Sequence, residues 1–228
     1  MKRAAVIAAA GVGRRMGGKV PKQYLDLLGK PVICHTLDCF VSSGIDEIIV
    51  VVEPDRVESF KAEIVEGFGY PSNVRVIAGG DVRQRSVYNG LMVTSHEVNV
   101  VLVHDGVRPF ISMEQIDNLS DMAFHKGACI LVHPIKETIK RVHSNGTIAE
   151  TVDREGLFGA QTPQAFRRDI ILGAMERAFA DGFIGTDEAS LFERCGGTIH
   201  IVAGDSRNIK ITTPSDLIVA EAIAREWK

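Results

Sequence analysis

Apolar runs that alternate with amphipathic stretches along the whole chain are the feature that most limits its fold. Several of the runs are continuous Val, Ile and Leu, as expected for strands that are covered on both faces. We expect strands at Ala4–Ala10, Glu47–Val52, Val74–Ala78, Val100–His104, Cys129–His133 and Ile199–Val202. Helical patterns separate them at Val32–Val41, Arg56–Glu66, Arg83–Thr94, Met113–His125, Arg168–Phe179 and Pro214–Trp227. This alternation predicts a mostly parallel, twisted α/β sheet with right-handed crossovers, of the Rossmann-like kind.

One segment breaks the alternation. Thr138–Val142 and Thr147–Val152 are β-prone and flank Ser144-Asn145-Gly146, and Asn-Gly between such runs is a strong hairpin signal. A two-stranded hairpin is marginal in water by itself, so it must pack on the parent domain or on a second subunit. No linker or repeat divides the 228 residues. We therefore expect one domain over residues 1–228 with a protruding β-hairpin arm at about 136–156.

The charge is distributed unevenly. The net charge is −3, yet residues 1–25 carry six basic residues and no acidic one, so the remainder carries −9. A mildly acidic body with one cationic segment suits a small anionic ligand, whereas a nucleic-acid footprint would spread over a face. We expect no nucleic-acid partner.

Targeting and metal signals are weak. No apolar run approaches the roughly 18 residues of a spanning helix, and the apolar stretch Ala4–Val12 runs into Arg14-Arg15, so we expect a cytoplasmic protein without membrane spans. The four cysteines form no CxxC pair. His125, Cys129 and His133 have a metal-like spacing, but Gly127 argues for a helix end between them rather than a ligand set.

A glycine-rich segment follows the first expected strand. Backbone N–H groups at such a turn can approach phosphate oxygens. Gly11, Gly13 and Gly17 form a dinucleotide-binding variant, but prolines and glycines downstream interrupt the long helix that should follow at once. The segment Gly13–Lys19 fits a phosphate loop, but Val20 stands where Ser or Thr is needed to hold magnesium. The remaining interpretation of this segment is a loop whose fixed basic side chains suit a triphosphate.

A series of segments occurs in order along nearly the whole chain: Ala9–Met16, Pro21–Tyr24, Gly79–Val87, Val103–Pro109, Lys136–Lys140, Thr151–Arg154, Gln161–Gln164, Thr186–Ala189 and Asn208–Lys210. In these segments the chain resembles one family of enzymes, the 2-C-methyl-D-erythritol 4-phosphate cytidylyltransferases of the non-mevalonate isoprenoid pathway. One departure is Gly106-Val107, where the family more often has two alanines. We expect this change to alter the backbone flexibility beside Asp105.

The resemblance implies a nucleotidyltransferase fold, Mg²⁺ as cofactor and the conversion of CTP and 2-C-methyl-D-erythritol 4-phosphate to 4-diphosphocytidyl-2-C-methyl-D-erythritol and pyrophosphate. It also implies a homodimer in which the arm completes the acceptor site. The resemblance implies that Arg15 and Lys22 stabilise the transition state and that Asp105 binds magnesium. It implies that the acceptor phosphate is positioned by Arg154 and Lys210, together with Arg108, Thr138 and Thr162. The residues that it implies for contact with the nucleotide are Ala9, Ala10, Gly11, Gly80, Asp81 and Ser86.

The chemistry is consistent with these residue types. The acceptor is a phosphate monoester with a second pKa near ~6, so it is already mostly a dianion and needs no general base. The barrier is repulsion between two anions, which basic side chains and a metal offset. Other interpretations stay open for single residues: Asp105 as a turn cap, Asp81 to Ser86 as a helix start, Lys210 as a solvated lysine, and Thr138 as a residue of simple β-propensity.

Three other functions also stay open. A cytidylyltransferase for another polyol phosphate, such as ribitol 5-phosphate, would share the loop chemistry and differ near Thr138, Arg154 and Thr162. A Rossmann-type oxidoreductase would bind NAD(P) instead of CTP. A catalytically silent nucleotide-binding regulator would bind CTP without releasing pyrophosphate.

Overall fold

A seven-stranded mixed sheet forms the centre of the molecule in the computed structural model, which describes residues 1–11 and 21–227. The strand order is β11-β7-β10-β6-β1-β4-β5, and every neighbouring pair is parallel except the two that involve β10. The strands span Arg3–Ala8 (β1), Glu47–Val52 (β4), Val74–Ala78 (β5), Val100–Asp105 (β6), Ala128–Pro134 (β7), Phe158–Arg167 (β10) and His200–Ala203 (β11). The expected mostly parallel α/β sheet is confirmed.

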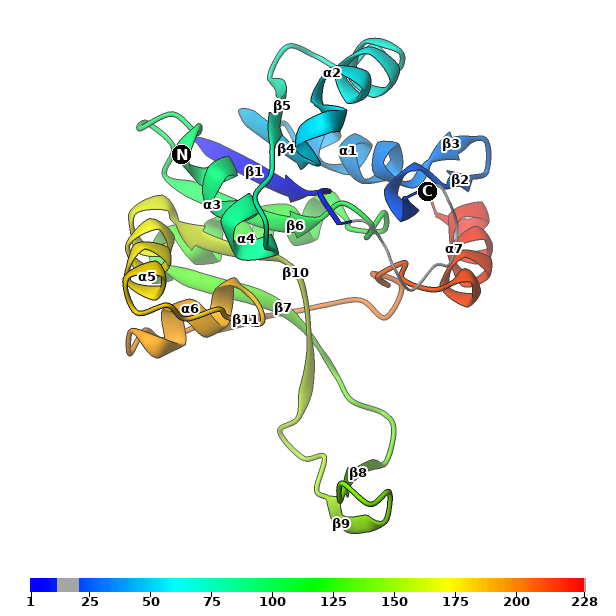
Figure 1. The fold of residues 1–228 in the computed structure, drawn as a ribbon, viewed down its shortest axis with the longest axis vertical. Helices are drawn as coiled ribbons and strands as arrows, with labels where there is room; N and C mark the ends of the chain where they lie inside the picture. The colour runs from blue at the N-terminus through cyan, green and yellow to red at the C-terminus, as the bar shows by residue number, and fades with distance from the viewer. Residues whose placement is uncertain (12–20, 228) are drawn as a thin grey trace.

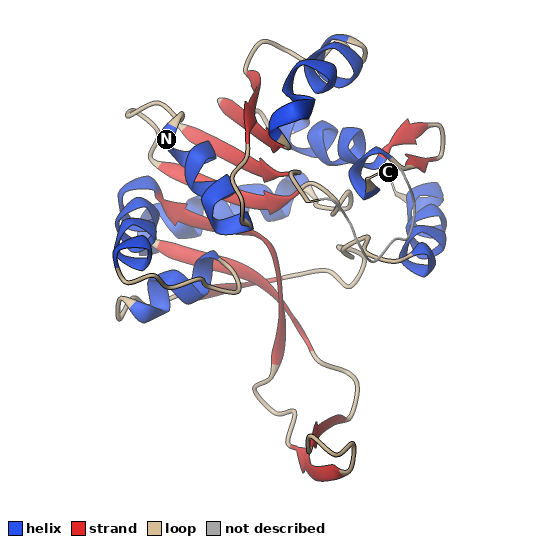
Figure 2. Cartoon of the chain, viewed as in Figure 1, coloured by secondary structure: helices blue, strands red, loops and turns tan. Residues whose placement is uncertain are grey.

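Helices cover both faces of this sheet (Figures 1 and 2). Alternate residues of each strand point to opposite faces, so Ala5 and Ile7 of β1 join one buried cluster while Ala4 and Val6 join the other. The first cluster includes residues of α1 (Val32–Ser42), α2 (Val57–Phe60) with the π-helical turn Lys61–Glu66, and α4 (Met113–Lys126). The second includes residues of α3 (Arg83–Met92), α5 (Arg168–Ala180) and α6 (Glu188–Arg194).

The C-terminal helix α7 (Pro214–Glu226) belongs to a third, smaller cluster. Its Ala220 is buried with Leu27 of β2 (Asp26–Leu27) and with Val107 and Phe110 from the segment after β6. The antiparallel partner of β2 is β3 (Lys30–Pro31), and short 3₁₀ turns occupy Lys22–Tyr24 and Pro54–Arg56. Within the described ranges, no helix has the length and apolar content needed to cross a membrane.

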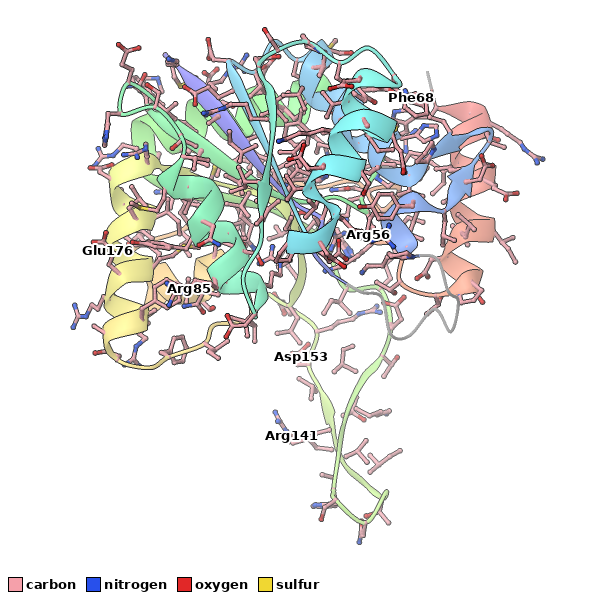
Figure 3. The ribbon with its side chains drawn as sticks, turned by 45° about the horizontal axis from the view of Figure 1, so that its top comes forward. Arg56, Phe68, Arg85, Arg141, Asp153 and Glu176 are labelled. Atoms are coloured by element: carbon pink, nitrogen blue, oxygen red, sulfur yellow. The ribbon has the colours of Figure 1, made fainter. Side chains whose placement is uncertain are left out.

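The arm extends away from the sheet where β7 and β10 leave it (Figure 1). Its tip is the antiparallel pair β8 (Ile139–Val142) and β9 (Ile148–Val152), which matches the expected hairpin. Val142 and Ile148 are more than half exposed. Figure 3 shows Asp153 where the arm leaves the body of the molecule and Arg141 further down the arm.

Candidate functional site

A cavity of about 280 Å³ lies at the carboxyl edge of the parallel strands, where open α/β sheets bind their ligands. Its described lining comes from the ends of β1 and β6, the turn before α3, the Lys22–Tyr24 turn and the segment before α7. It contains Ala8, Ala9, Ala10, Gly11, Lys22, Gln23, Gly80, Asp81, Val82, Arg83, Ser86, Asp105, Val107 and Lys210. All six residues expected to contact the nucleotide are therefore brought together, with Lys22, Lys210 and Asp105 beside them.

The turn after β5 forms one wall of the cavity. The Gly80 N–H donates to Ser86 Oγ at 3.0 Å, which fixes the turn against the first turn of α3. A Cβ on Gly79 would lie 2.9 Å from Ala10 Cβ and 3.2 Å from the Val52 carbonyl oxygen, so only glycine permits this approach to the end of β1. Ser86 therefore has a definite structural role here, and the N-cap of α3 is Val82, not Asp81.

The opposite wall is held by Gln23. Its Nε2 donates to the Ala9 carbonyl at 2.8 Å, although 14 residues separate the two positions. Gln23 is itself buried. The turn that carries Lys22 is thereby tied directly to the end of β1, next to the glycine-rich segment.

Asp105 is the centre of the charged cluster at the end of β6. Lys210 Nζ lies 2.8 Å from its Oδ2, Arg83 Nη2 lies 3.2 Å from its Oδ1, and Arg108 Nε lies 3.6 Å from Oδ2. Burial of this side chain alone would raise its pKa, but the nearby cations, Arg83 first and then Lys210, hold the pKa of Asp105 well below its usual range. Asp105 is therefore an anion at neutral pH, and Lys210 is an ion-pair partner rather than a solvated lysine.

Arg83 also lines the cavity, although no role was predicted for it. Its Nη1 contacts Glu188 Oε1 at 2.7 Å, so the guanidinium joins Glu188 to Asp105. Glu188 is 1% exposed, and its Oε2 has no hydrogen-bond partner among the residues that the structure describes. Burial raises the pKa of Glu188 and outweighs the opposing effect of Arg83. The signal in the sequence was a basic residue at the start of the helix that follows Gly79-Gly80-Asp81.

The residues expected to meet the acceptor fall into two groups. Lys210 and Arg108 lie at the cluster, and Thr162 lies directly behind Asp105 with 6% exposure. Thr138 and Arg154 lie on the exposed arm, where Arg154 Nη1 donates to the Lys136 carbonyl. Neither arm residue is among the described residues that line the cavity. Arg15 lies outside the described residues.

The donor set fits a magnesium ion that arrives with phosphate oxygens. Mg²⁺ is usually held by one or two carboxylates together with substrate phosphates and water, and Asp105 offers one ionised carboxylate at the cavity wall. In the part of the chain that the structure describes, no group of three His, Cys, Asp or Glu side chains could hold a metal by itself. The spacing His125, Cys129, His133 forms no such group, because α4 ends at Lys126 and the buried Cys129 thiol donates to the Leu119 carbonyl.

A sheet of this topology, with glycine turns and lysines around a cavity at its carboxyl edge, is typical of α/β proteins that bind phosphorylated ligands. Comparison with known proteins narrows this class. Residues 3–226 match the family described as 2-C-methyl-D-erythritol 4-phosphate cytidylyltransferase. The chain belongs to this family of nucleotidyltransferase enzymes, and the expected family is confirmed.

Individual relatives agree over nearly the full length. The chain is 45% identical to the 2-C-methyl-D-erythritol 4-phosphate cytidylyltransferase of Geotalea uraniireducens, over 99% of this chain and 97% of the relative. It is also 45% identical to the protein of the same name from Bacillus licheniformis, over 98% and 96%. Among solved structures, it is similar to the 4-diphosphocytidyl-2C-methyl-D-erythritol synthase of Anaerococcus prevotii, with a TM-score of 0.86, 33% identity, and coverage of 98% of this chain and 96% of that chain.

Proposed function

We propose that this enzyme transfers a cytidylyl group from CTP to the phosphate of 2-C-methyl-D-erythritol 4-phosphate and releases pyrophosphate. The observation that carries the proposal is the cavity at the carboxyl edge, which gathers the six candidate nucleotide contacts with Lys22, Lys210 and Asp105. The names of the relatives support the identity of both substrates. The product would be 4-diphosphocytidyl-2-C-methyl-D-erythritol, a precursor for isoprenoids.

The reaction needs charge compensation more than proton transfer. CTP brings about four negative charges and the acceptor about two, because a phosphate monoester is mostly a dianion at neutral pH. The acceptor oxygen is therefore already a nucleophile. Lys22 and Lys210 line the cavity, and we expect Lys22, with Arg15, to stabilise the charge that develops on the α-phosphate and the departing pyrophosphate.

We propose Asp105 as the residue that holds Mg²⁺ when the nucleotide binds. The ion would supply two positive charges between the phosphate groups, which lowers their mutual repulsion. Asp105 suits this task because it is ionised and faces the cavity from the end of β6. Lys210 would keep its place beside the carboxylate and present its ammonium group to the acceptor phosphate.

We propose further that the active enzyme is a homodimer in which the arm of one subunit completes the site of the other. The support is the separation of the acceptor residues: Lys210 and Arg108 are in the body, while Thr138 and Arg154 are on a hairpin that projects from it. The exposed Val142 and Ile148 at the tip give the hairpin apolar surface for a partner. We also place the reaction in the cytoplasm, since all four cysteines are free thiols.

Pyrophosphate release tests the function directly. We expect release with CTP, Mg²⁺ and 2-C-methyl-D-erythritol 4-phosphate together, and little with ATP, GTP or UTP in place of CTP. Ribitol 5-phosphate serves as the competing acceptor, and preference for it would overturn the proposed substrate. Thermal stabilisation by CTP without any release would indicate a regulator, and stabilisation by NAD(P) alone would indicate an oxidoreductase.

Mixed dimers test the shared site. A Lys210→Ala subunit and an Arg154→Ala subunit, carrying different affinity tags, are co-expressed, and the heterodimer is isolated. If each site takes Lys210 from one chain and Arg154 from the other, one of the two sites is intact and the heterodimer recovers about half of the wild-type activity. Activity no higher than that of either homodimeric variant would contradict the proposal.

A further inference from the structure

Two buried side-chain amides join the acceptor side of the cavity to the central sheet. They belong to Gln161 of β10 and to Asn208, which lies two residues before Lys210. Gln161 Nε2 donates to the Asp205 carbonyl at 2.9 Å and to the Asn208 carbonyl at 3.3 Å. Asn208 Nδ2 donates to the Thr162 carbonyl at 2.9 Å and to Gln161 Oε1 at 3.4 Å. Both amides therefore use their two N–H donors inside the protein.

An irregularity in β10 explains why side chains are needed at this place. The pairing of β10 with β7 shifts its register between Ala160 and Gln164, and such a shift leaves backbone polar groups without a partner in the ladder. A buried carbonyl that stays unpaired costs free energy, and the Asn208 amide supplies a donor to the Thr162 carbonyl. The amide pair is therefore part of how this strand is built into the sheet beside the cavity.

The same pair holds the segment that carries Lys210. At one end of this segment, Asn208 is bonded through its side chain and its carbonyl. At the other end, the buried Ile211 donates its N–H to the Val107 carbonyl at 3.0 Å. Lys210 lies between the two attachments, with its Nζ 2.8 Å from Asp105 Oδ2. The place of the lysine backbone is therefore set by these two points.

Arg108 is attached at the first of these points. Its Nη1 donates to the Asn208 carbonyl at 2.7 Å, and this oxygen also accepts from Gln161 Nε2. Arg108, Thr162 and Lys210 are three of the five residues that are expected to meet the acceptor. Asn208 contacts the first through its carbonyl, contacts the second through its amide, and lies two positions before the third. One buried asparagine thus joins three candidate acceptor residues.

We propose that Gln161 and Asn208 are positioning residues, which hold Lys210 and Arg108 at the places where these two meet the acceptor phosphate. The inference rests on the proposed function, because it gives the amide pair a role in that reaction. The pair acts through its neighbours: neither amide is among the described residues that line the cavity. A displacement of about 1 Å at a positioned group can cost about 100-fold in rate. A small movement of this segment should therefore be measurable in turnover.

Nearly isosteric variants test the role of each amide in the use of the acceptor. Gln161→Met and Asn208→Leu each remove two N–H donors and nearly keep the side-chain volume. We expect kcat/KM for the acceptor to fall about 10- to 100-fold in either variant. The Kd of CTP with Mg²⁺, measured by calorimetry without acceptor, should stay within about threefold, because the candidate nucleotide contacts lie on the turns after β1 and β5. Unchanged kcat/KM for the acceptor, or an equal loss of CTP affinity, would overturn the proposal.

Asn73→Leu is the matched control. Asn73 Nδ2 donates to the Ile45 carbonyl at 2.8 Å, and its Oδ1, like that of Asn208, is buried without a hydrogen-bond partner among the described residues. Asn73 directly precedes β5, at the amino edge of the sheet and away from the cavity. The control should lower the midpoint of thermal unfolding and leave kcat/KM for the acceptor unchanged. A loss as large as that of Asn208→Leu would show a general effect of weaker folding and would refute the positioning role.

The double variant tests whether the amides act together. Gln161 and Asn208 bond each other and hold one segment. The loss of kcat/KM in Gln161→Met/Asn208→Leu should therefore be smaller than the product of the two single losses. A loss equal to that product would contradict joint action. If Asn208→Leu does not fold, Gln161→Met alone decides the proposal, by the kinetic comparison above and by the exchange measurement below.

Amide hydrogen exchange provides a readout that does not depend on activity. The Ile211 N–H, which is bonded to the Val107 carbonyl, reports on the segment around Lys210. In Gln161→Met, the ratio of its exchange rate to that of the β1 amides should rise at least about 10-fold, because the segment opens locally. An unchanged ratio would overturn the inference. If the ratio rises but the wild-type protein releases no pyrophosphate with any acceptor, the proposed function fails while the attachment by the amide pair stands.

Discussion

Replacing Lys210 by methionine should separate catalysis from stability. Lys210 Nζ lies 2.8 Å from Asp105 Oδ2, but the lysine side chain is 36% exposed, and pairs of this kind contribute only about 0–1 kcal/mol to folding. Asp105 also keeps Arg83 and Arg108 after the substitution. The midpoint of thermal unfolding should therefore change little. Loss of one preorganised cationic donor, by contrast, costs about 10²–10³-fold in kcat, or about 3–4 kcal/mol in the barrier.

The assay is pyrophosphate release with Mg²⁺, CTP and acceptor, together with thermal unfolding of the same samples. Lys126→Met is the control, because this lysine is exposed at the end of α4 and lies outside the described cavity lining. It should behave as the wild type in both measurements. If Lys210→Met keeps kcat/KM within about threefold of the wild type, the ammonium group contributes nothing to the transition state and the charge-compensation argument is refuted.

Three further changes have definite expected outcomes. Glu188→Gln removes the buried counter-charge of Arg83 but keeps an acceptor for it, so urea denaturation should show a loss of about 1–3 kcal/mol; unchanged stability would contradict the buried pair. Burial raises the pKa of Cys129 to about 12, so the unfolded chain ionises first and stability falls as pH rises from about 9 towards 12. Between about pH 8 and pH 10.5, the free energy of unfolding of the wild type should fall by about 2 kcal/mol more than that of Cys129→Ala. An equal fall in the two proteins would disprove the raised pKa of Cys129. EDTA should abolish pyrophosphate release yet leave the unfolding midpoint unchanged, since no three-residue metal cluster lies in the described residues; a lower midpoint would indicate a structural metal.

The parallel strands were predictable because burial on both faces leaves a plain signal. Glu47–Val52 and Val74–Ala78 have the expected boundaries, and β6 extends one residue past its expected end to include Asp105. The two faces alternate strictly along β1, so nearly every side chain must be apolar. A run of Val and Ile between polar turns has few other structures available to it.

The strand β10 was not predicted, for a physical reason. Its central residues Gln161, Thr162 and Gln164 are polar but buried, and each is satisfied by partners more than 20 residues away. For example, Gln164 donates to Asp187 and accepts from the Ala189 N–H. Because these buried residues are polar, the strand has neither an apolar run nor an alternation of apolar and polar residues. The partners that make their burial possible cannot be identified from the local sequence. Local periodicity also gives no information about its antiparallel position between β6 and β7.

In the candidate site, too, some features could be predicted from the local sequence and others could not. The turns at Gly11 and Gly80 and the strand end at Asp105 could be located from the sequence, because glycines and acids at strand ends have local signatures. The link from Arg83 to Glu188 could not, since 105 residues separate the two side chains. The contact between Thr162 and His104 likewise joins residues 58 positions apart. Side-chain roles that arise from long-range packing need the fold before they can be assigned.

Asp105 explains how several basic groups can converge before any substrate binds. Three like charges near one point repel one another, and without a counter-charge they would turn towards solvent. Asp105 draws Lys210, Arg83 and Arg108 together while its own backbone is held by the turn beneath it. In the proposed reaction, the phosphate oxygens would meet Lys210 and Arg83, which already line the cavity, so little reorganisation would be needed. The backbone contacts that hold the Asp105 turn are therefore as important to the proposed chemistry as the positive charges.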